Sequence, residues 1–263
     1  MFKIIQEDKN SKARLGQVLT ARGPIKTPCF MPVGTQGTVK ALSPLELQQA
    51  GAEVMLCNAY HLFLRPGIEV IRKAGGLHRF ISWPKAILTD SGGYQIFSLA
   101  LFRRISDEGV EFKSHLDGSK FFLTPESLID LQQAFGSDIM MPLDECVQYP
   151  CAKDYAELAM QRTVDWARRS KAVIENRVTG NGDWVTKNTK SVNSVPRQLL
   201  FGIVQGATYE DLRKECIQRI TDIGFDGYAI GGVSVGEPAV LRYNITTFIL
   251  DHLPKQKARY LMG

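Results

Sequence analysis

The sequence predicts an α/β fold in which helices cover a parallel sheet, with a (β/α)8 TIM barrel as its architecture. Short, nearly continuous apolar runs recur along the chain, and such runs are typical of strands that are buried on both faces. Helical patterns lie between these runs, and strands that alternate with helices require parallel connections. The length of 263 residues is also one at which such a barrel commonly forms a single domain.

Seven apolar runs are the predicted barrel strands. They are Pro28–Val33, Glu53–Asn58, Ala86–Ser91, Ile139–Asp144, Leu199–Gln205, Gly227–Gly232 and Ala258–Gly263. A closed barrel of this kind needs eight strands. We therefore expect residues 1–263 to form one incomplete barrel domain, the amino-terminal and central part of a longer one.

Five helices are expected between these strands, over residues 43–51, 124–136, 154–174, 209–223 and 238–253. The first has a clear start signal, because Ser43 can act as the N-cap, Pro44 fits the first helical position and Glu46 is placed for a capping box. Thr124 and Pro125 open the second helix in the same way. The other three are inferred from apolar residues at helical spacing.

Three segments depart from the alternation. Val110–Phe112 and Lys120–Leu123 flank an Asp-Gly turn and predict a β-hairpin inserted after the third strand. The residues before Pro28 resemble antiparallel strands that plug or flank the barrel. The polar stretch 177–196 is expected to be a flexible surface insertion.

Composition narrows the class of protein only partly. The chain has 32 basic and 27 acidic residues, a net charge of +5 that is compatible with a polyanionic partner. Its densest basic groups, Arg103-Arg104 and Arg168-Arg169, are equally explained by ordinary surface charge, and RNA contact by the latter is the alternative. No apolar run is long enough to span a membrane, and the amino terminus becomes charged too soon for a signal peptide.

The five cysteines form an odd set without a Cys-x-x-Cys pair. They are Cys29, Cys57, Cys146, Cys151 and Cys216. Such a set in a chain of ordinary size indicates a reduced, cytoplasmic protein.

The residues with the richest chemistry follow the predicted strands. In a parallel barrel the carboxyl ends of the strands meet at one mouth, where the active site lies. Asp90 follows the third strand, Asp144 the fourth, Gln205 the fifth and the pair Gly231-Gly232 the sixth. We expect two carboxylates, an amide and a glycine pair to converge there.

This set suits a guanine-like base, which presents a ring N–H and an exocyclic amine beside a carbonyl. Asp144 can accept from the two donors, whereas Gln205 can donate to the carbonyl. A backbone N–H of Gly231 or Gly232 can do the same, because glycine has no side chain to block a close approach. Tyr94 offers an aromatic face for stacking and Met262 an adaptable apolar wall.

Each of these residues also has a purely structural explanation. Asp90 lies in an Asp-Ser-Gly-Gly run that could simply cap a helix, and Asp144 could be a structural acid at a strand end. The pairs Gly92-Gly93 and Gly231-Gly232 do not match a phosphate-binding loop. The four histidines lack metal-ligand spacing and receive no role. The choice therefore depends on whether the motifs form a recognisable set.

Six segments form such a set, in order along the chain. They are "NAYHLFLRPG" at Asn58–Gly67, "TDSGGYQ" at Thr89–Gln95, "PLDEC" at Pro142–Cys146, "GIVQG" at Gly202–Gly206, "AIGGVSVGE" at Ala229–Glu237 and "RYLMG" at Arg259–Gly263. Together they closely resemble the motifs of the tRNA-guanine transglycosylases. The likeness covers essentially the whole chain, so it is far more specific than any single motif.

The resemblance implies an enzyme that removes guanine from the wobble position of certain tRNAs and inserts a 7-deazaguanine during queuosine biosynthesis. A nucleophilic aspartate would hold the RNA covalently while the bases exchange. Asp90 would be the acid/base catalyst. The implied substrate-binding residues are Asp90, Ser91, Gly92, Gly93, Tyr94, Asp144, Cys146, Gln205, Gly231, Gly232 and Met262. Asn58 and Gln95 would face the ribose, and Gly263 would begin a loop that contacts RNA.

Two positions bear on which base is inserted. Cys146, two residues after the base-reading Asp144, matches the bacterial pattern. Val235 also matches it, because the eukaryotic enzymes carry glycine there. A valine side chain would crowd the bulky cyclopentenediol of queuine, so we expect the small aminomethyl precursor preQ1.

The chain departs from the family pattern after the Arg259–Gly263 motif. In the family, the nucleophilic aspartate and a structural zinc site of Cys-x-Cys-x-x-Cys plus histidine follow that motif, and neither is present in residues 1–263. We expect this chain alone to be inactive. The resemblance further implies a homodimer for the full-length enzyme.

Two other functions remain open. The chain could be a non-catalytic base- or RNA-binding subunit that pairs with a catalytic partner, although the retained Asp90, Asp144 and Gln205 argue against it. It could instead be an unrelated barrel enzyme for a phosphorylated metabolite, although no phosphate-binding glycine loop supports that function.

Overall fold

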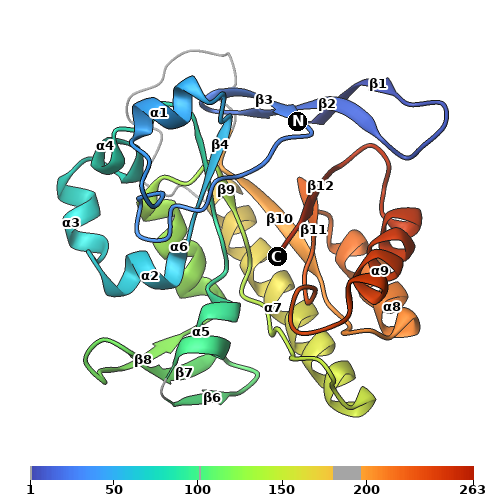
Figure 1. Cartoon of the computed structure of the whole chain (residues 1–263). Helices are drawn as coiled ribbons and strands as arrows, with labels where there is room; N and C mark the ends of the chain where they lie inside the picture. Colours follow the sequence, from blue (N-terminus) through green and yellow to red (C-terminus); the bar gives the residue numbers. More distant parts are fainter. Residues whose placement is uncertain (1, 101, 180–196) are drawn as a thin grey trace.

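A six-stranded parallel sheet forms the centre of the protein (Figure 1). The computed structural model describes residues 2–100, 102–179 and 197–263. The strands are β4 (Val54–Cys57), β5 (Ala86–Thr89), β9 (Ile139–Met140), β10 (Leu199–Val204), β11 (Gly227–Ile230) and β12 (Ala258–Leu261). They lie in the order β12-β11-β10-β9-β5-β4, and every neighbouring pair is parallel. In the described residues the sheet curls into a half-barrel, which confirms the predicted fold class.

The first predicted strand, Pro28–Val33, is confirmed in position but not in length. Only Val33 forms a parallel bridge, to Leu56 of β4. The Leu56 N–H donates to Pro32 O at 3.0 Å, and the Gly34 N–H donates to Leu56 O at 2.7 Å. Pro28 and Pro32 have no backbone N–H, so this segment cannot form a regular ladder.

Both faces of the sheet are buried, as the continuous apolar runs predict. On β10, Leu199, Phe201 and Ile203 belong to the cluster inside the half-barrel. Leu200 and Val204 point to the other side and pack against the helices. Successive side chains of a strand point to opposite faces, so a strand covered on both sides needs apolar residues at every position.

Nine helices occur in the described residues, and they cover the outer face of the sheet and its ends. They are α1 (Pro44–Gln49), α2 (Ala59–Leu64), α3 (Ile68–Lys73), α4 (Leu77–Ile81), α5 (Gly93–Leu99), α6 (Pro125–Phe135), α7 (Lys153–Thr179), α8 (Glu210–Ile223) and α9 (Ala239–His252). The five predicted helices correspond to α1, α6, α7, α8 and α9. The helices α2 to α5 were not predicted, because at five to seven residues they are too short to show a periodic pattern.

Two of the helix ends test the sequence signals directly. Ser43 forms the predicted capping box of α1, in which its Oγ accepts from the Glu46 N–H and the Glu46 carboxylate accepts from the Ser43 N–H. By contrast, α7 is longer than predicted: it continues to Thr179 and includes the first three residues of the predicted polar insertion. The rest of that insertion, residues 180–196, lies outside the described residues.

Two small antiparallel sheets close the ends of the half-barrel (Figure 1). The amino-terminal sheet, β1 (Phe2–Glu7), β2 (Arg14–Thr20) and β3 (Gly23–Thr27), buries Val18 and Ile25 in the barrel interior, so it plugs the end where the parallel strands begin. The second sheet, β6 (Arg103–Ile105), β7 (Val110–Lys113) and β8 (Lys120–Leu123), lies beyond α5 at the opposite end. It contains the predicted hairpin and one further strand, β6.

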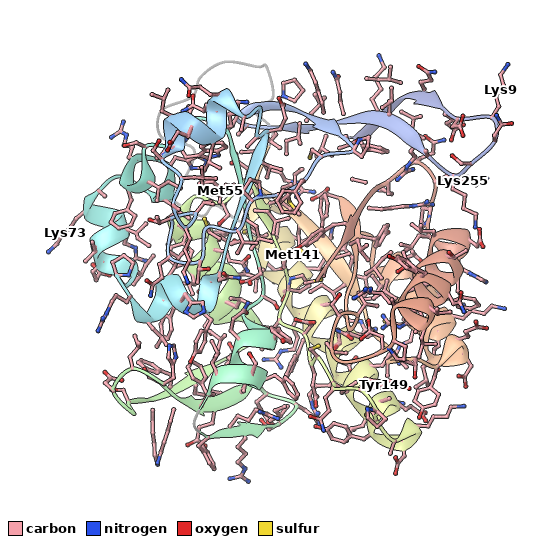
Figure 2. All side chains as sticks on the ribbon, in the orientation of Figure 1. Lys9, Met55, Lys73, Met141, Tyr149 and Lys255 are labelled. Atoms are coloured by element: carbon pink, nitrogen blue, oxygen red, sulfur yellow. The ribbon has the colours of Figure 1, made fainter. Side chains whose placement is uncertain are left out.

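Most charged side chains lie at the periphery and most large apolar ones inside, as for Lys73 and Lys255 compared with Met55 and Met141 in Figure 2. Among the helices that the structure describes, none is long and apolar enough to cross a membrane.

Candidate active site

Asp90 lies immediately after β5, at the carboxyl end of the sheet, and its carboxylate is buried. The Ala59 N–H, in the first turn of α2, donates to Oδ1 at 2.8 Å. The side-chain amides of Asn58 and Gln95 both donate to Oδ2, the latter at 3.0 Å. The two residues expected at the ribose therefore hold the acid/base candidate in place.

Burial raises the pKa of Asp90 from 3.8 to about 6, because a charged carboxylate loses its hydration. The hydrogen bonds from Asn58, Ala59 and Gln95 oppose this shift by stabilising the anion. A carboxyl group with a pKa near 6 can both give and accept a proton close to neutral pH. This property fits the acid/base role that the sequence predicts.

Asp144 lies in the segment after β9 and is also buried. The Ser91 hydroxyl donates to its Oδ1 at 2.5 Å, and the Gln205 amide donates to its Oδ2 at 2.7 Å. Burial raises its pKa, the Ser91 and Gln205 hydrogen bonds lower it, and the neighbouring Glu145 raises it further. The tertiary structure thus brings together residues from the ends of β5, β9 and β10, as predicted.

Two buried amide oxygens near these carboxylates have no hydrogen-bond partner in the described part of the chain. They are Gln205 Oε1 and Gln95 Oε1. Buried polar atoms are almost always paired, and these two oxygens lie beside the Asp90 and Asp144 carboxylates with their acceptor capacity unused. Here both can accept a hydrogen bond from a donor such as a ring N–H, an amine or a hydroxyl.

Glycines bring the backbone close to the polar groups of the site. A Cβ on Gly93 would lie 2.7 Å from Asp144 Oδ1, and one on Gly232 would lie 2.3 Å from Gln205 Oε1. A Cβ on Gly231 would lie 2.9 Å from Gln205 Nε2. The site therefore has no room for a side chain at these three positions.

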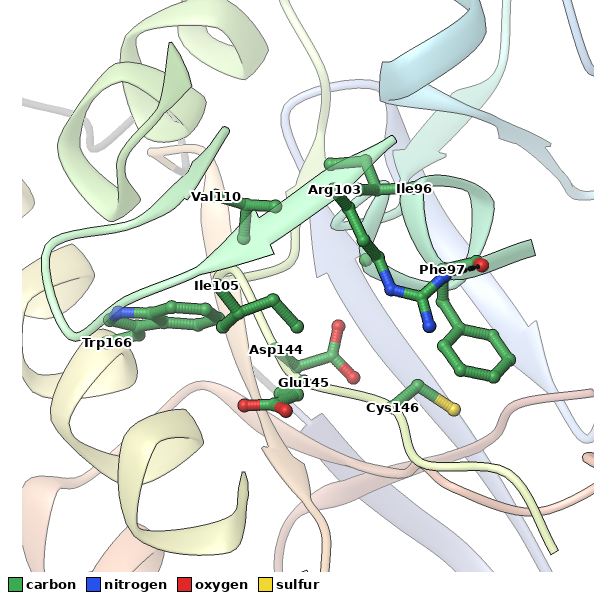
Figure 3. A pocket seen from close by; sticks show the side chains of 10 residues that line it. Ile96, Phe97, Arg103, Ile105, Val110, Asp144, Glu145, Cys146 and Trp166 are labelled. Carbon is green, nitrogen blue, oxygen red and sulfur yellow. Dashed lines mark hydrogen bonds between the residues drawn. The ribbon is translucent and has the colours of Figure 1, made fainter. Parts of the chain in front are cut away.

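A small cavity opens beside Asp144, between α5, the β6–β7 strands and α7 (Figure 3). Its lining residues are Gly93, Ile96, Phe97, Arg103, Ile105, Val110, Asp144, Glu145, Cys146 and Trp166. Figure 3 shows the side chains of Arg103 and Asp144 extending toward one another across this space. Of the predicted site residues, Gly93, Asp144 and Cys146 line it.

The remaining predicted residues lie around the strand ends. Tyr94, in the first turn of α5, is 48% exposed, so its ring is accessible for stacking. Met262 follows β12, donates from its N–H to Ile230 O at 3.2 Å and packs partly into the barrel interior. Gly263 lies next to Ser234 and has a φ of +149°, which favours glycine.

Glu145 is a buried residue of the site whose role the sequence did not reveal. Its carboxylate accepts from the Tyr155 hydroxyl at 2.6 Å and forms an ion pair with Arg162, both on α7. Arg162 also pairs with Asp107 in the β6–β7 turn. Adjacency to Asp144 in the Pro142–Cys146 motif was the one available signal.

The described residues contain no group of three or more His, Cys, Asp or Glu side chains that could hold a metal ion. They therefore offer no ligand set for the structural zinc that the resemblance implies. The chemistry available in the described site is that of two buried carboxylates, amide groups and backbone N–H groups.

These observations define a class of protein: a parallel α/β half-barrel with a polar site of two buried carboxylates at the carboxyl ends of its strands. The family model described as "Queuine tRNA-ribosyltransferase" matches residues 8–263. The chain belongs to the queuine tRNA-ribosyltransferase family, which confirms the resemblance found in the motifs.

Curated relatives agree with this membership. The chain is 53% identical over 262 residues to the queuine tRNA-ribosyltransferase of Caldanaerobacter subterraneus subsp. tengcongensis, and the match covers 100% of this chain and 65% of that protein. It is 51% identical over 275 residues to the protein of the same name from Aquifex aeolicus, covering 67% of it. The chain thus spans about two thirds of the length of these relatives.

Proposed function

We propose that this chain forms the base-binding and acid/base part of a tRNA-guanine transglycosylase, which exchanges guanine at the anticodon wobble position for a 7-deazaguanine. The observation that carries the proposal is the buried Asp144 carboxylate, held on both oxygens by Ser91 and Gln205 at the strand ends. Family membership of residues 8–263 supports the same reaction.

In the proposed mechanism Asp144 reads the base. Its anion accepts from the ring N–H and the exocyclic amine of guanine, two donors that adenine does not present together. The carbonyl of the base then faces the second N–H of Gln205 Nε2 and the N–H of Gly232, because the Gly231 N–H already donates to Val204 O. Ser91 and Gln205 support this role because hydrogen bonds to the carboxylate favour its charged form.

Asp90 moves the proton of the exchange. It protonates the leaving guanine when the glycosidic bond breaks and accepts the proton of the incoming base. A pKa raised to about 6 supports both steps near neutral pH. The amides of Asn58 and Gln95 keep the carboxylate in one orientation and carry acceptor oxygens that suit the ribose hydroxyls.

The residue that attacks the ribose is proposed to lie outside residues 1–263. In the family pattern it follows the Arg259–Gly263 motif, as do the zinc ligands. We expect the 263-residue chain to bind the base without exchanging it, and the full-length enzyme to work as a homodimer on tRNA.

The incoming base is proposed to be preQ1. Val235 lies in the turn between β11 and α9, where its N–H donates to Glu237 Oε2 at 2.8 Å. A side chain in this turn leaves less room for a large substituent on the base.

All five cysteines are free, which supports a reducing compartment such as the cytoplasm.

The test is calorimetric titration of the purified chain with guanine and with hypoxanthine, which lacks the exocyclic amine. Guanine should bind more tightly, because Asp144 accepts from that amine. Asp144→Asn should weaken guanine binding by roughly 10- to 100-fold and remove the preference, since hydrogen bonds to a charged group contribute about 1.5–3 kcal/mol.

A matched control is Asp226→Asn, a buried carboxylate at the opposite end of β11 that pairs with Arg197. This variant should keep the guanine affinity of the wild type. Equal affinity of the wild type for guanine and hypoxanthine would contradict base reading by Asp144. Incorporation of labelled guanine into tRNA by the 263-residue chain alone would contradict the placement of the nucleophile.

A further inference from the structure

Arg213 is a fully buried cation beside the proposed base site. Both its burial and its place in a helix disfavour a positive charge. It lies in the first turn of α8, where the helix dipole disfavours positive charge. Among the described residues it forms no ion pair with a carboxylate, and burial lowers its pKa to about 10. Burying an unpaired charge is costly, so a compensating interaction is required.

The compensation comes from four backbone carbonyls at the carboxyl ends of two adjacent strands. The Arg213 guanidinium donates from Nε to Ala207 O at 2.8 Å and from Nη1 to Val204 O at 2.8 Å. It also donates from Nη1 to Gly231 O at 2.7 Å and from Nη2 to Gly232 O at 3.0 Å. The planar group therefore ties the end of β10 to the end of β11.

The hydrogen bond from Arg213 to the Gly231 carbonyl also fixes the direction of the Gly232 N–H. In a trans peptide the C=O and the following N–H point in opposite directions. Because Arg213 holds the Gly231 carbonyl, the N–H of Gly232 must point away from Arg213. The Gly232 N–H interacts with the Cys146 thiol, whose pKa burial raises to about 12, and Cys146 lines the cavity beside Asp144.

We infer that Arg213 is a positioning residue that fixes the polarity of the Gly231-Gly232 peptide, so that its N–H and not its C=O faces the base. This inference rests on the proposed function, in which that N–H serves the carbonyl of guanine. With the peptide reversed, a carbonyl oxygen would face the carbonyl of the base and repel it.

The hydrogen bonds from Arg213 to Ala207 O and Gly232 O also stabilise two turns whose backbones have positive φ angles. Gly232 has a φ of +61°, and Ala207 has a φ of +49°, which is unfavourable for a residue with a side chain. Arg213 accepts no hydrogen bond, so it can only select conformations that turn carbonyls toward it. It thereby orders both turns that flank the Gln205 side chain.

Binding of two bases to Arg213→Lys tests the inference. Lysine keeps the charge, but its single ammonium cannot replace a planar fork that contacts four carbonyls. Guanine should bind about tenfold more weakly to the variant, the effect of losing one oriented hydrogen bond. The base 2-aminopurine keeps the exocyclic amine but lacks both the carbonyl and the adjacent ring N–H, so it binds the wild type more weakly than guanine does. Its affinity should fall a further twofold or less in Arg213→Lys.

Arg219→Lys on the same helix is the matched control, because Arg219 is partly exposed and pairs with Glu215 and Asp165. It should leave both affinities unchanged. Equal losses for guanine and 2-aminopurine in Arg213→Lys would overturn the inference, since a merely structural role predicts them. Failure of the wild type to bind guanine would instead overturn the proposed function.

A second measurement on the wild type keeps the inference testable if Arg213→Lys does not fold. The amide resonance of Gly232 in a ¹⁵N–¹H spectrum should move downfield on addition of guanine and much less on addition of 2-aminopurine. A Gly232 resonance that responds equally to the two bases would show that its N–H does not face the carbonyl.

Discussion

Gln205 donates from Nε2 to Asp144 Oδ2 over 2.7 Å, while its own Oε1 is buried without a hydrogen-bond partner among the described residues. One half of the amide therefore holds the carboxylate, and the other half is available to a ligand. An unpaired buried oxygen costs free energy until a donor reaches it. The Gln205 amide and the Asp144 carboxylate are therefore already oriented to bind a polar ligand.

Gln205→Met should weaken guanine binding by roughly 10- to 100-fold, because Asp144 loses a hydrogen bond worth about 1.5–3 kcal/mol to its charged form. Methionine has a similar length, so packing should change little. The control is Gln198→Met, since Gln198 makes a comparable bond to Ser137 O at the other end of the sheet. Calorimetric titration measures both, and an unchanged affinity in Gln205→Met would remove Gln205 from the site.

Asp90→Asn should change how stability depends on pH. The pKa of Asp90 is raised from 3.8 to about 6, so between these values the folded protein holds the proton more tightly than the unfolded chain. Its stabilising contribution is fully present below about pH 4 and is lost as the pH rises through 6. Asparagine does not titrate, so the stability of the variant relative to the wild type should rise by up to about 3 kcal/mol from pH 4 to 7.

Urea unfolding at a series of pH values between 4 and 7 measures this effect. Asp8→Asn serves as the control, because the hydrogen bond with Ser11 lowers the pKa of that exposed carboxyl instead of raising it. A difference between Asp90→Asn and the wild type that stays constant over this range would show that Asp90 has an ordinary pKa.

Gly93→Ala should distort the site by collision with the Asp144 backbone. The added Cβ would lie 2.4 Å from Asp144 O, so α5 or the segment after β9 must shift. We expect a loss of about 1–3 kcal/mol in stability and a strong loss of guanine binding. Gly118→Ala is the control, because its Cβ meets no atom within 4 Å although its φ is +74°.

The Gly118 variant should lose about 1 kcal/mol through backbone strain and keep full affinity. Denaturation and calorimetry on both variants separate the two effects. If Gly93→Ala bound guanine like the wild type, close contact between α5 and Asp144 would not matter for the site.

Arg162→Met should destabilise the protein by about 3–5 kcal/mol, because it leaves the buried Glu145 carboxylate without its cation. The double variant Glu145→Gln/Arg162→Met should recover part of that loss, since the uncompensated charge is gone. Arg168→Met removes an exposed pair with Asp165 and should cost less than about 1 kcal/mol. Chemical denaturation that gives equal losses for Arg162→Met and Arg168→Met would contradict a structural role for the buried pair.

Much of the fold follows from local signals in the sequence. The capping residue Ser43 starts α1 where expected, and β10 appears where Leu199–Gln205 is continuously apolar. The four short helices and strand β6 were not predicted, because one or two turns of helix carry no period and β6 is only three residues long. Pro28 and Pro32 shortened a predicted strand to one bridge by removing N–H donors.

The sequence by itself determined the family and the parallel strands, and it predicted that Asp90, Asp144 and Gln205 lie together, because parallel strands bring their carboxyl ends to one edge. The tertiary structure decided which groups pair there. Glu145 finds its cation on α7, and Arg213 reaches from the first turn of α8 to the carbonyls of Gly231 and Gly232. These contacts join residues that are distant in sequence, and their geometry depends on how helices pack on the sheet, which local periodicity does not encode.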